Sequence, residues 1–466
     1  MAAPDLKLSQ FQIDDADPFS RDIRELNEFV SPGVLRRYQL AIWNEGLFEL
    51  QTPFQAAPLA ITRSIGAKRN ELWLGGQLQD GKEVWLLTGL VHEGFPIVAA
   101  VVIEAPESSS FDYVALKKSP AIKSGPPTEK LVRFRDLRQT ISIDWSRSVE
   151  PELAIGHTNF AHFCWNELPA LANILEDSGN PSPACHKVRV EHSTLAPMPE
   201  IFPELNSQQF FFVGESANFG RDDSLIFRAG SSVLDKRAKR RIQRVVRSAD
   251  LAPEVKELGQ RIERDALTTV WITLRFKNRT STNQFEFIVH LVKALLNGFD
   301  DLLIVLNGFS IPEGALQPPS EATAEHPQVL NCRAFYSDLM ERIPDNAKHR
   351  VVDLSGVSVK DAIYLAGFSS FYIAHPGTIQ HKVGWFWEKS GVLVEPQRGE
   401  RIANWYAKNV EDSIKPYCVD PKFFDVHPSG DDLDRNAFYE IIDVDGLVQQ
   451  ILSLAEPHLL DGRSKA

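Results

Sequence analysis

The chain has 466 residues, of which 43% are hydrophobic and 24% are charged, a composition typical of a globular protein with more than one domain. Its formal net charge of −12 disfavours nonspecific binding to nucleic acid, so we expect no nucleic-acid partner. The four cysteines, Cys164, Cys185, Cys332 and Cys418, have neither the CxxC spacing of a zinc site nor the density of a disulfide framework. This pattern predicts reduced, buried thiols in a cytoplasmic protein.

Residues 1–130 are predicted to form a partly β accessory segment. The first ten residues lack the basic and apolar regions of a signal peptide, and no apolar run in the chain is long enough to cross a membrane. After helical signals in 11–44, the runs 71–78 and 83–91 flank Asp80-Gly81 like the strands of a hairpin, and 95–104 reads as another strand. The acidic cluster Asp14, Asp15 and Asp17 favours a solvated surface over a metal site.

Residues 131–265 are predicted to form a Rossmann-like lobe. Strands are expected at 141–145, 187–191 and 209–213, and a long helical region at 231–264. The basic run 236–247 lies on one face of that helical region. It favours a solvated helix face and leaves open a contact with a glycan phosphate or a peripheral contact with an anionic inner membrane.

A helix is also predicted over 156–179, with Thr158 or Asn159 as its N-cap and a kink or split at Pro169. A line of polar residues runs along this otherwise apolar helix and consists of Asn159, His162 and Asn166, with Glu167 on the adjoining stripe. Burying such a line is costly unless its members are paired or functional. A satisfied buried histidine beside an N-cap asparagine and a proton-handling site both remain open.

Residues 266–466 are predicted to form a second Rossmann-like lobe ending in a helix at 445–456. Strands at 268–274, 301–306, 349–354, 371–374 and 392–395 alternate with helices at 285–297, 336–343, 359–367 and 379–389. This alternation is typical of a parallel sheet, in which ligands bind beyond the carboxyl ends of the strands.

The turn between the last two βα elements is a candidate phosphate-binding site. Pro376 has no N–H group, and Gly377 permits a close approach of the backbone. The residues at this junction are His375, Gly377, Thr378, His381 and Lys382. The competing interpretation is that the glycine and threonine act only as helix caps.

The motifs occur in an order that resembles glycosyltransferase family 61, the DUF563-type proteins that include enzymes of capsular polysaccharide biosynthesis. HTNFAHFCWNELPAL lies in the first lobe, and AHPGTIQHKVGW and LVEP close the second, so the resemblance covers roughly residues 140–400. It implies an α/β fold of the GT-B type, with two Rossmann-like lobes facing a cleft. It also implies that the second lobe holds the nucleotide-sugar and that no bound metal or other cofactor is needed.

The resemblance assigns residues to the two lobes. Asn159 and His162 match the motif of the first lobe, whose acidic position is Asn166, with Glu167 next to it. The family's donor-binding positions fall on Arg275, Arg279, Asn283, His375, His381 and Glu395, although Gln284 stands where the family has a glutamate, and His381 where it has an asparagine.

These assignments suggest a division of chemical roles. Glu167 is the preferred base, and His162 is either its partner or the base itself. The departing diphosphate would be neutralised by Arg275, His375, Lys382 and the backbone amides of residues 377 and 378. Glu395 would bind the ribose, and a single base would make the reaction inverting.

The sequence therefore predicts a cytoplasmic glycosyltransferase of surface polysaccharide biosynthesis. It would use a nucleotide-sugar donor and a glycan or lipid-linked glycan acceptor. Two alternatives stay open: a transferase of CMP-activated sugars, which the His375-Pro376 pair resembles, and a catalytically degenerate module that binds glycans or acts as a scaffold. A metal-dependent transferase using Asp300-Asp301 or Asp431-Asp432 is weakly supported, since both pairs lie at common solvated positions. The sequence does not define the sugar or the oligomeric state.

Overall fold

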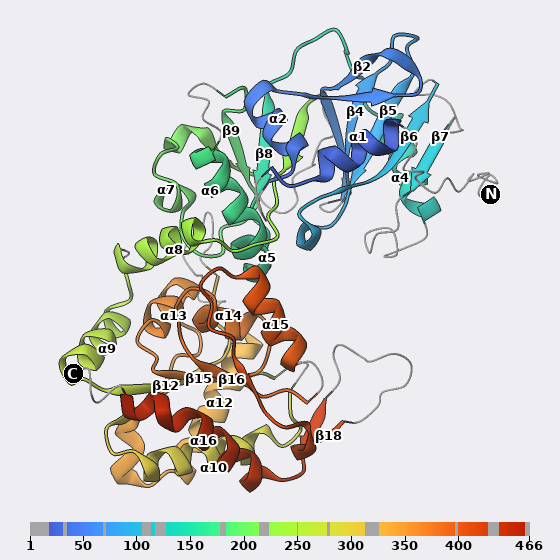
Figure 1. Cartoon of the computed structure of the whole chain (residues 1–466). Coiled ribbons are helices and arrows are strands. Elements are labelled where there is room, and N and C mark those ends of the chain that lie inside the picture. The colour runs from blue at the N-terminus through green and yellow to red at the C-terminus, as the bar shows by residue number, and fades with distance from the viewer. Residues whose placement is uncertain are drawn as a thin grey trace. The chain divides into compact units, whose positions relative to one another are not determined.

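The computed structural model describes residues 18–30, 35–68, 71–104, 113–116, 127–177, 183–213, 223–248, 250–276, 280–312, 326–396, 399–426 and 438–461. The chain forms two compact units, one from residues 1–193 and 202–238 and the other from 194–201 and 239–466 (Figure 1). The acidic cluster at 14–17, the pair Asp431-Asp432 and the predicted donor-binding residue Arg279 lie outside the described residues.

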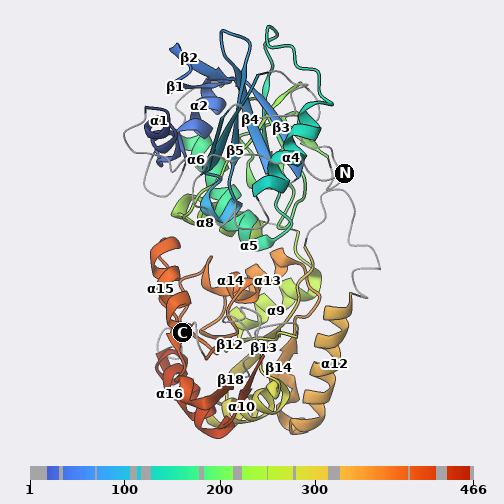
Figure 2. The same ribbon diagram turned by 90° about the vertical axis from the view of Figure 1, so that its right-hand side faces the viewer.

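An antiparallel sheet in the order β3-β4-β5-β6-β7 forms part of the first unit (Figure 2). Its strands are β3 (Arg63–Lys68), β4 (Glu71–Gln77), β5 (Glu83–Thr88), β6 (Ile97–Ile103) and β7 (Tyr113–Leu116). β4 and β5 pair antiparallel on either side of Gly81, which confirms the predicted hairpin. The sheet is covered by α4 (Pro127–Arg138), whose Phe134 stacks on Trp73 with ring centroids 4.3 Å apart. The first segment is therefore partly β, as expected.

A parallel sheet in the order β10-β9-β8-β11 forms the other part of the first unit. Its strands are β8 (Pro151–Ile155), β9 (Lys187–Val190), β10 (Phe210–Phe212) and β11 (Leu225–Arg228). An antiparallel bridge between Ser64 and Ser224 links it to the antiparallel sheet. Further elements of this unit are α1 (Pro18–Asn27), α2 (Arg37–Glu45), the paired strands β1 (Phe48–Thr52) and β2 (Gln55–Ile61), and two 3-10 turns, η1 (Val91–Glu93) and η3 (Ser207–Gln209).

The strand predicted at 141–145 is wrong. These residues form an irregular segment, and the adjacent strand of the parallel sheet is β8 instead. The apolar alternation has another cause, because Ile141 and Trp145 pack against the core of the antiparallel sheet and the indole N–H of Trp145 donates to Glu83 at 3.1 Å. The alternation of apolar residues at 141–145 thus reflects burial of these side chains and not pairing in a sheet.

The predicted helix at 156–179 is a continuous helical segment with an irregular turn. It consists of α5 (Phe160–His162), the π-helical turn η2 (Phe163–Glu167) and α6 (Leu168–Asp177). The N–H of Leu168 bonds to the carbonyl of Phe163, five residues back. Because Pro169 has no N–H to continue the α-helical ladder, the expected kink or split takes the form of a π turn.

The second unit contains a six-stranded parallel sheet in the order β14-β13-β12-β15-β16-β17. Its strands are β12 (Thr268–Thr273), β13 (Leu302–Asn307), β14 (Val351–Asp353), β15 (Phe371–Ala374), β16 (Gly391–Leu393) and β17 (Tyr417–Cys418). Counted along the chain, the strand order is 3-2-1-4-5-6, which is that of the dinucleotide-binding Rossmann fold. The order reverses between β12 and β15, and this is where such folds bind ligands.

Helices cover both faces of this sheet (Figures 1 and 2). They are α9 (Pro253–Arg264), α10 (Gln284–Gly298), α12 (Pro327–Arg342), α13 (Val359–Ala366), α14 (Thr378–Gly384), α15 (Gly399–Asn409) and α16 (Val444–Asp461). α10, α12 and α16 share one apolar core with the strands, and α16 confirms the predicted C-terminal helix. Shorter elements are α7 (Met198–Ile201), η4 (Asp345–Arg350), η5 (Pro421–Phe423) and the antiparallel pair β18 (Phe424–Val426) and β19 (Tyr439–Ile441).

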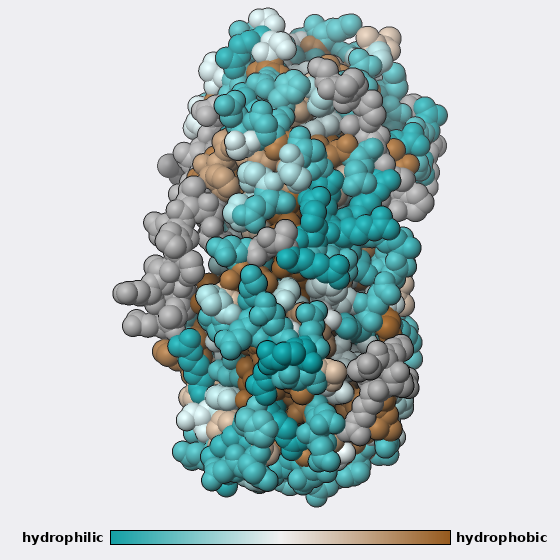
Figure 3. Space-filling view, turned by 90° about the vertical axis from the view of Figure 1, so that its left-hand side faces the viewer, coloured by the Kyte–Doolittle hydropathy of each residue, from teal (hydrophilic) through white to brown (hydrophobic). Residues whose placement is uncertain are grey.

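The helical region predicted at 231–264 is two helices, α8 (Lys236–Ser248) and α9, and the second begins at Pro253. The basic run on α8 is only partly solvated. Four of its side chains are exposed, Lys236, Arg240, Arg244 and Arg247, whereas Lys239 is buried and donates to the carbonyl of Glu411 at 2.6 Å. The side of the molecule that carries α8 and α9 is largely hydrophilic (Figure 3).

The expected α/β class with two Rossmann-like parallel sheets is confirmed. The four cysteines are unpaired, and Cys164, Cys185 and Cys332 are buried, as predicted, whereas Cys418 is only half-buried. None of the described helices combines the length and the hydropathy needed to span a bilayer.

Candidate functional site

The candidate residues of the first unit lie at the carboxyl edge of its parallel sheet. Along the chain, the order of these strands is 3-2-1-4, so β8 and β11 lie side by side where the order reverses. The chain leaves β8 through Gly156 and enters the helical segment that carries His162. It leaves β11 towards Ser231, whose N–H bonds to the carbonyl of Asn166 at 2.8 Å. The two loops at this switch point are thus joined.

His162 is held in a defined orientation. Its Nδ1 lies 3.1 Å from Oδ1 of Asn166, and the amide nitrogen of Asn166 donates to the carbonyl of Ser231 at 2.6 Å. Because this second bond fixes Oδ1 as an acceptor, His162 carries its proton on Nδ1 and its Nε2 is a lone-pair acceptor. Burial lowers the pKa of His162, with a smaller contribution from nearby His92, so the ring is neutral at pH 7.

Glu167 is a buried anchor of the loop after β8. Its Oε2 accepts hydrogen bonds from the backbone N–H groups of Gly156 at 2.8 Å and His157 at 2.7 Å. Its Oε1 is 3.0 Å from Nη1 of Arg228, which also pairs with Glu191. The side chain of Glu167 is 0% exposed. The contacts of Glu167 hold structure together, and its role as a base stays a prediction.

Asn159 caps the start of the helical segment. Its Oδ1 accepts the N–H of Ala161 at 2.9 Å, and its own N–H donates to Nδ1 of His157, also at 2.9 Å. Of the two residues predicted as N-cap, the structure therefore uses Asn159. This contact caps the helix, and a role of Asn159 in supporting an acceptor site stays a prediction.

In the second unit, Arg275 and Gly377 meet where the strand order reverses. Arg275 follows β12, and its Nη1 donates to the carbonyl of Pro376 at 3.0 Å in the turn after β15. Gly377 has φ = +122°, a conformation that favours glycine, and a Cβ there would lie 2.7 Å from Nη1 of Arg275. A guanidinium and a glycine turn therefore occupy the expected ligand position of the sheet.

His375 is enclosed by protein partners. It is 2% exposed, with Nε2 at 3.1 Å from Oε1 of Gln284 and Nδ1 at 2.9 Å from the hydroxyl of Tyr439. Gln284 also donates to the carbonyl of Arg275 and accepts its N–H, which fixes the amide orientation. Burial lowers the pKa of His375 to about 3, and Arg275 lowers it further, so the ring is neutral. In the described structure His375 positions Arg275 and contributes no positive charge.

Lys382 lies beneath the same edge of the sheet. It is 3% exposed, and its ammonium donates to Oδ1 of Asn307, to the carbonyl of Gly308 at 3.2 Å and to Oγ of Ser310 at 2.8 Å. All three acceptors are neutral, and burial lowers the pKa of Lys382 to about 7. The lysine ties α14 to the loop after β13, and at pH 7 its charged and neutral forms coexist close to the switch point.

The remaining predicted donor-binding residues differ in their surroundings. His381 stacks on Trp385, with ring centroids 3.7 Å apart, and contacts the hydroxyl of Tyr406. Asn283 bonds to both the N–H and the carbonyl of Ile441, which is a structural clamp. Glu395 is buried just beyond β16. Thr378 begins α14, and its side chain lies outside the described part of the structure.

Sequence reasoning missed four residues that complete these surroundings: His92, His157, Arg228 and Tyr439. The ring of His157 lies 4.9 Å from that of His162 between centroids, and the ring of His92 lies 6.4 Å from it. The sequence offered a signal only for His157, because the Gly156-His157 pair ends the apolar run of β8. Nothing in the sequence linked residue 92 to residue 162.

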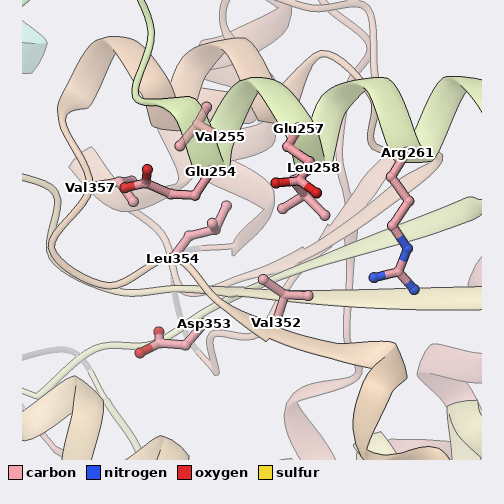
Figure 4. A pocket seen from close by; sticks show the side chains of 9 residues that line it. All are labelled: Glu254, Val255, Glu257, Leu258, Arg261, Val352, Asp353, Leu354 and Val357. Carbon is pink, nitrogen blue, oxygen red and sulfur yellow. The ribbon is translucent and has the colours of Figure 1, made fainter.

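A separate cavity of about 420 Å³ lies between α9 and the end of β14 (Figure 4). It is lined by Glu254, Val255, Glu257, Leu258, Arg261, Val352, Asp353, Leu354 and Val357. None of the predicted site residues contributes to it. Within the described ranges, no group of three or more His, Cys, Asp or Glu side chains is arranged to hold a metal ion.

Comparison with protein-family models and with curated proteins gives no match. Among solved structures, the chain is similar to ADP-heptose LPS heptosyltransferase II of E. coli, with 11% identity, a TM-score of 0.37 and coverage of 67% of this chain and 99% of the other. A family 9 glycosyl transferase from Veillonella parvula has 9% identity and a TM-score of 0.35, with coverage of 67% and 97%. UDP-GlcNAc 2-epimerase from Methanocaldococcus jannaschii has 14% identity and a TM-score of 0.29, with coverage of 68% and 77%.

Proposed function

We propose that this chain is a glycosyltransferase of the GT-B type, related to family 61, that moves a sugar from a nucleotide-sugar donor to a glycan acceptor. The observation that carries the proposal is the sheet of the second unit, whose 3-2-1-4-5-6 order brings Arg275 against Gly377 at the switch point. A Rossmann sheet with a cation and a glycine turn at this position is suited to a nucleoside diphosphate.

The donor half of the reaction needs positive charge. When a sugar leaves a nucleoside diphosphate, negative charge builds up on the diphosphate and must be stabilised. Arg275 is partly exposed beside the turn after β15, and Lys382 supplies a second cation from beneath it. Glu395, at the end of the next strand, is the group we assign to the ribose hydroxyls.

The acceptor half needs a proton acceptor. His162 is neutral at pH 7, and Asn166 orients it so that Nε2 is the basic atom. Among the described residues, Nε2 of His162 has no hydrogen-bond partner. A histidine oriented by a neutral side-chain oxygen is the base arrangement of several hydrolases, and it suits removal of a hydroxyl proton. We therefore assign the base to His162 in preference to the buried Glu167, and a single base gives inversion.

The proposal extends to partners and setting. The donor is a nucleotide-sugar, and the acceptor is a free or lipid-linked glycan of surface polysaccharide biosynthesis, such as a capsule. The reaction takes place in the cytoplasm, where the exposed basic residues of α8 offer a contact with the inner membrane surface. No metal takes part in this scheme, because Arg275 and Lys382 supply the charge.

A nucleotide panel tests the proposal directly. UDP, GDP, ADP and CMP are added to the full chain, melting is followed, and the matching nucleotide-sugars are then tested for transfer with and without EDTA. We expect one nucleoside diphosphate to raise the melting temperature and its sugar to be transferred in the presence of EDTA. Stabilisation by CMP alone would indicate a transferase of CMP-activated sugars. No binding at millimolar nucleotide would indicate a degenerate module, and loss of transfer in EDTA would contradict metal independence.

A further inference from the structure

The loop between β5 and β6 has an unusual backbone. It forms the 3-10 turn Val91–Glu93, after which Gly94 adopts φ = +69° and Phe95 adopts φ = +52°. Positive φ is rare for a bulky aromatic residue and strains the backbone. Such a conformation persists only where surrounding contacts hold it, and it is found most often at functional sites.

Helix α2 and its N-cap residue Arg36 supply the contacts that hold this loop. The guanidinium of Arg36, which is 8% exposed, donates to the carbonyls of Asn27, Glu93 and Gly94, the last at 2.8 Å. The hydroxyl of Tyr38 donates to the carbonyl of Phe95 at 2.6 Å. An ordinary connection between two antiparallel strands needs no buried arginine, so the loop is built to keep one particular shape.

The same loop is continuous with the candidate site of the first unit. The ring of Phe95 lies 5.9 Å from Cζ of Arg228, and Arg228 in turn pairs with Glu167. A Cβ on Gly94 would lie 3.1 Å from the carbonyl oxygen of Gly230, so the loop also touches the segment after β11. Within this turn, His92 is the exposed side chain, while Val91 and Phe95 are buried.

We propose that His92 is an acceptor-binding residue of the same site as His162, so that the N-terminal antiparallel sheet completes this site. This inference rests on the proposed function. The centroids of the two rings are 6.4 Å apart with an angle of 38° between the planes, and among the described contacts no hydrogen bond joins them. His92 is exposed and His162 is half-buried, and the short distance between their rings puts both at one part of the unit's surface.

This arrangement fits an acceptor with neighbouring hydroxyl groups. His162 removes the proton from one hydroxyl through Nε2, and His92 hydrogen-bonds an adjacent hydroxyl of the same sugar ring. The hydroxyl oxygen then attacks the anomeric carbon of the donor, the bond to the diphosphate breaks, and the proton stays on His162. The substrate class is therefore a polyhydroxylated sugar acceptor and not a single isolated alcohol.

The first test needs no transferase activity. Histidine-selective NMR follows the titration of His162 in the wild type, in His92→Gln and in the control His186→Gln, which alters an exposed histidine of the same unit. The titratable rings near His162 in the described structure are His92 and His157, whereas the carboxylate of Glu167 faces Arg228. Removing His92 removes a neighbouring positive charge, so the pKa of His162 should rise in His92→Gln and stay unchanged in the control. An unchanged titration in His92→Gln would overturn the proposal.

The second test is kinetic. With an active donor and acceptor, loss of one neutral hydrogen bond in His92→Ala should raise the KM for the acceptor about five- to tenfold and leave the KM for the donor unchanged. Equal increases in both KM values, or none, would overturn the proposal. If the wild type transfers no sugar but the titration of His162 responds to His92, the transferase assignment fails while the shared site stands.

Discussion

Nδ1 of His162 and Oδ1 of Asn166 lie 3.1 Å apart, across the π turn of one helical segment. Replacing Asn166 with alanine removes the group that fixes the tautomer, so kcat should fall about 10²-fold. Replacing it with aspartate keeps an acceptor but adds a negative charge, which favours the imidazolium. The acid limb of the kcat/KM profile should then move to higher pH. Melting curves of both variants control for the lost bond to Ser231, and an unmoved acid limb in Asn166→Asp would remove His162 as the base.

Gly377 should be intolerant of substitution because of Arg275. In Gly377→Ala the new Cβ meets Nη1 of Arg275 and also imposes a strained φ, so stability should fall by about 1–3 kcal/mol and affinity for the nucleotide should fall as well. The matched control is Gly81→Ala, which has φ = +89° with nothing within 4 Å of its Cβ. It should lose stability through strain alone and retain affinity. If the two variants bound the nucleotide with equal affinity, the turn at Gly377 would not be part of the donor-binding site.

Glu167→Gln distinguishes an anchor from a base. As an anchor, Glu167 holds two backbone N–H groups and Arg228, so the amide should lower stability by about 1–3 kcal/mol, measured by urea unfolding. Glu191→Gln, which alters the other carboxylate on Arg228, is the matched control and should also destabilise. A fully stable Glu167→Gln without transfer activity would instead support the role of base.

His375 should make stability depend on pH. Its pKa is about 3 in the folded chain and about 6.5 when unfolded, so between these values the unfolded chain binds more protons. Stability is therefore complete above pH 6.5 and is lost as pH falls towards 3, by about 2 kcal/mol at pH 5. His375→Gln should be less stable at pH 7 but should show a shallower decline between pH 7 and pH 5 in denaturant unfolding. If the stability of the wild type and of His375→Gln declined equally between pH 7 and pH 5, His375 would not be buried in its neutral form.

Lys382 should couple donor binding to proton uptake. Because burial lowers its pKa to about 7, most of the population is uncharged at pH 8, and a diphosphate bound nearby would raise the pKa. Calorimetry at pH 8 in two buffers with different ionisation enthalpies should show protons taken up on binding of the stabilising nucleotide. Lys382→Met should bind more weakly and take up fewer protons. Identical uptake in this variant would assign the proton to another group.

Much of the fold could be predicted because local patterns and tertiary structure agree in the second unit. The strand predicted at 371–374 is β15, and the helix predicted at 359–367 is α13. The predicted helix at 379–389 ends earlier, at Gly384, since the indole N–H of Trp387 bonds to the carbonyl of Ile363 and the chain turns away. In the first unit, β8 and β11 were not predicted from the sequence. Each has only four or five residues, and its extended conformation depends on pairing with neighbouring strands of the sheet.

The amino-acid sequence alone was enough to predict which chemical groups are available and that strands and helices alternate, because periodic burial and turn chemistry are local properties. It also determined that Asn166 follows His162 by four residues, which makes their contact a property of any helix there. Which polar side chains are buried against protein partners, and which stay available to a substrate, depends on the folded structure. It placed Glu167 against Arg228 and His375 between Gln284 and Tyr439, and it brought His92 beside His162. Burial and charge pairing depend on residues far apart in the chain, and no local pattern encodes them.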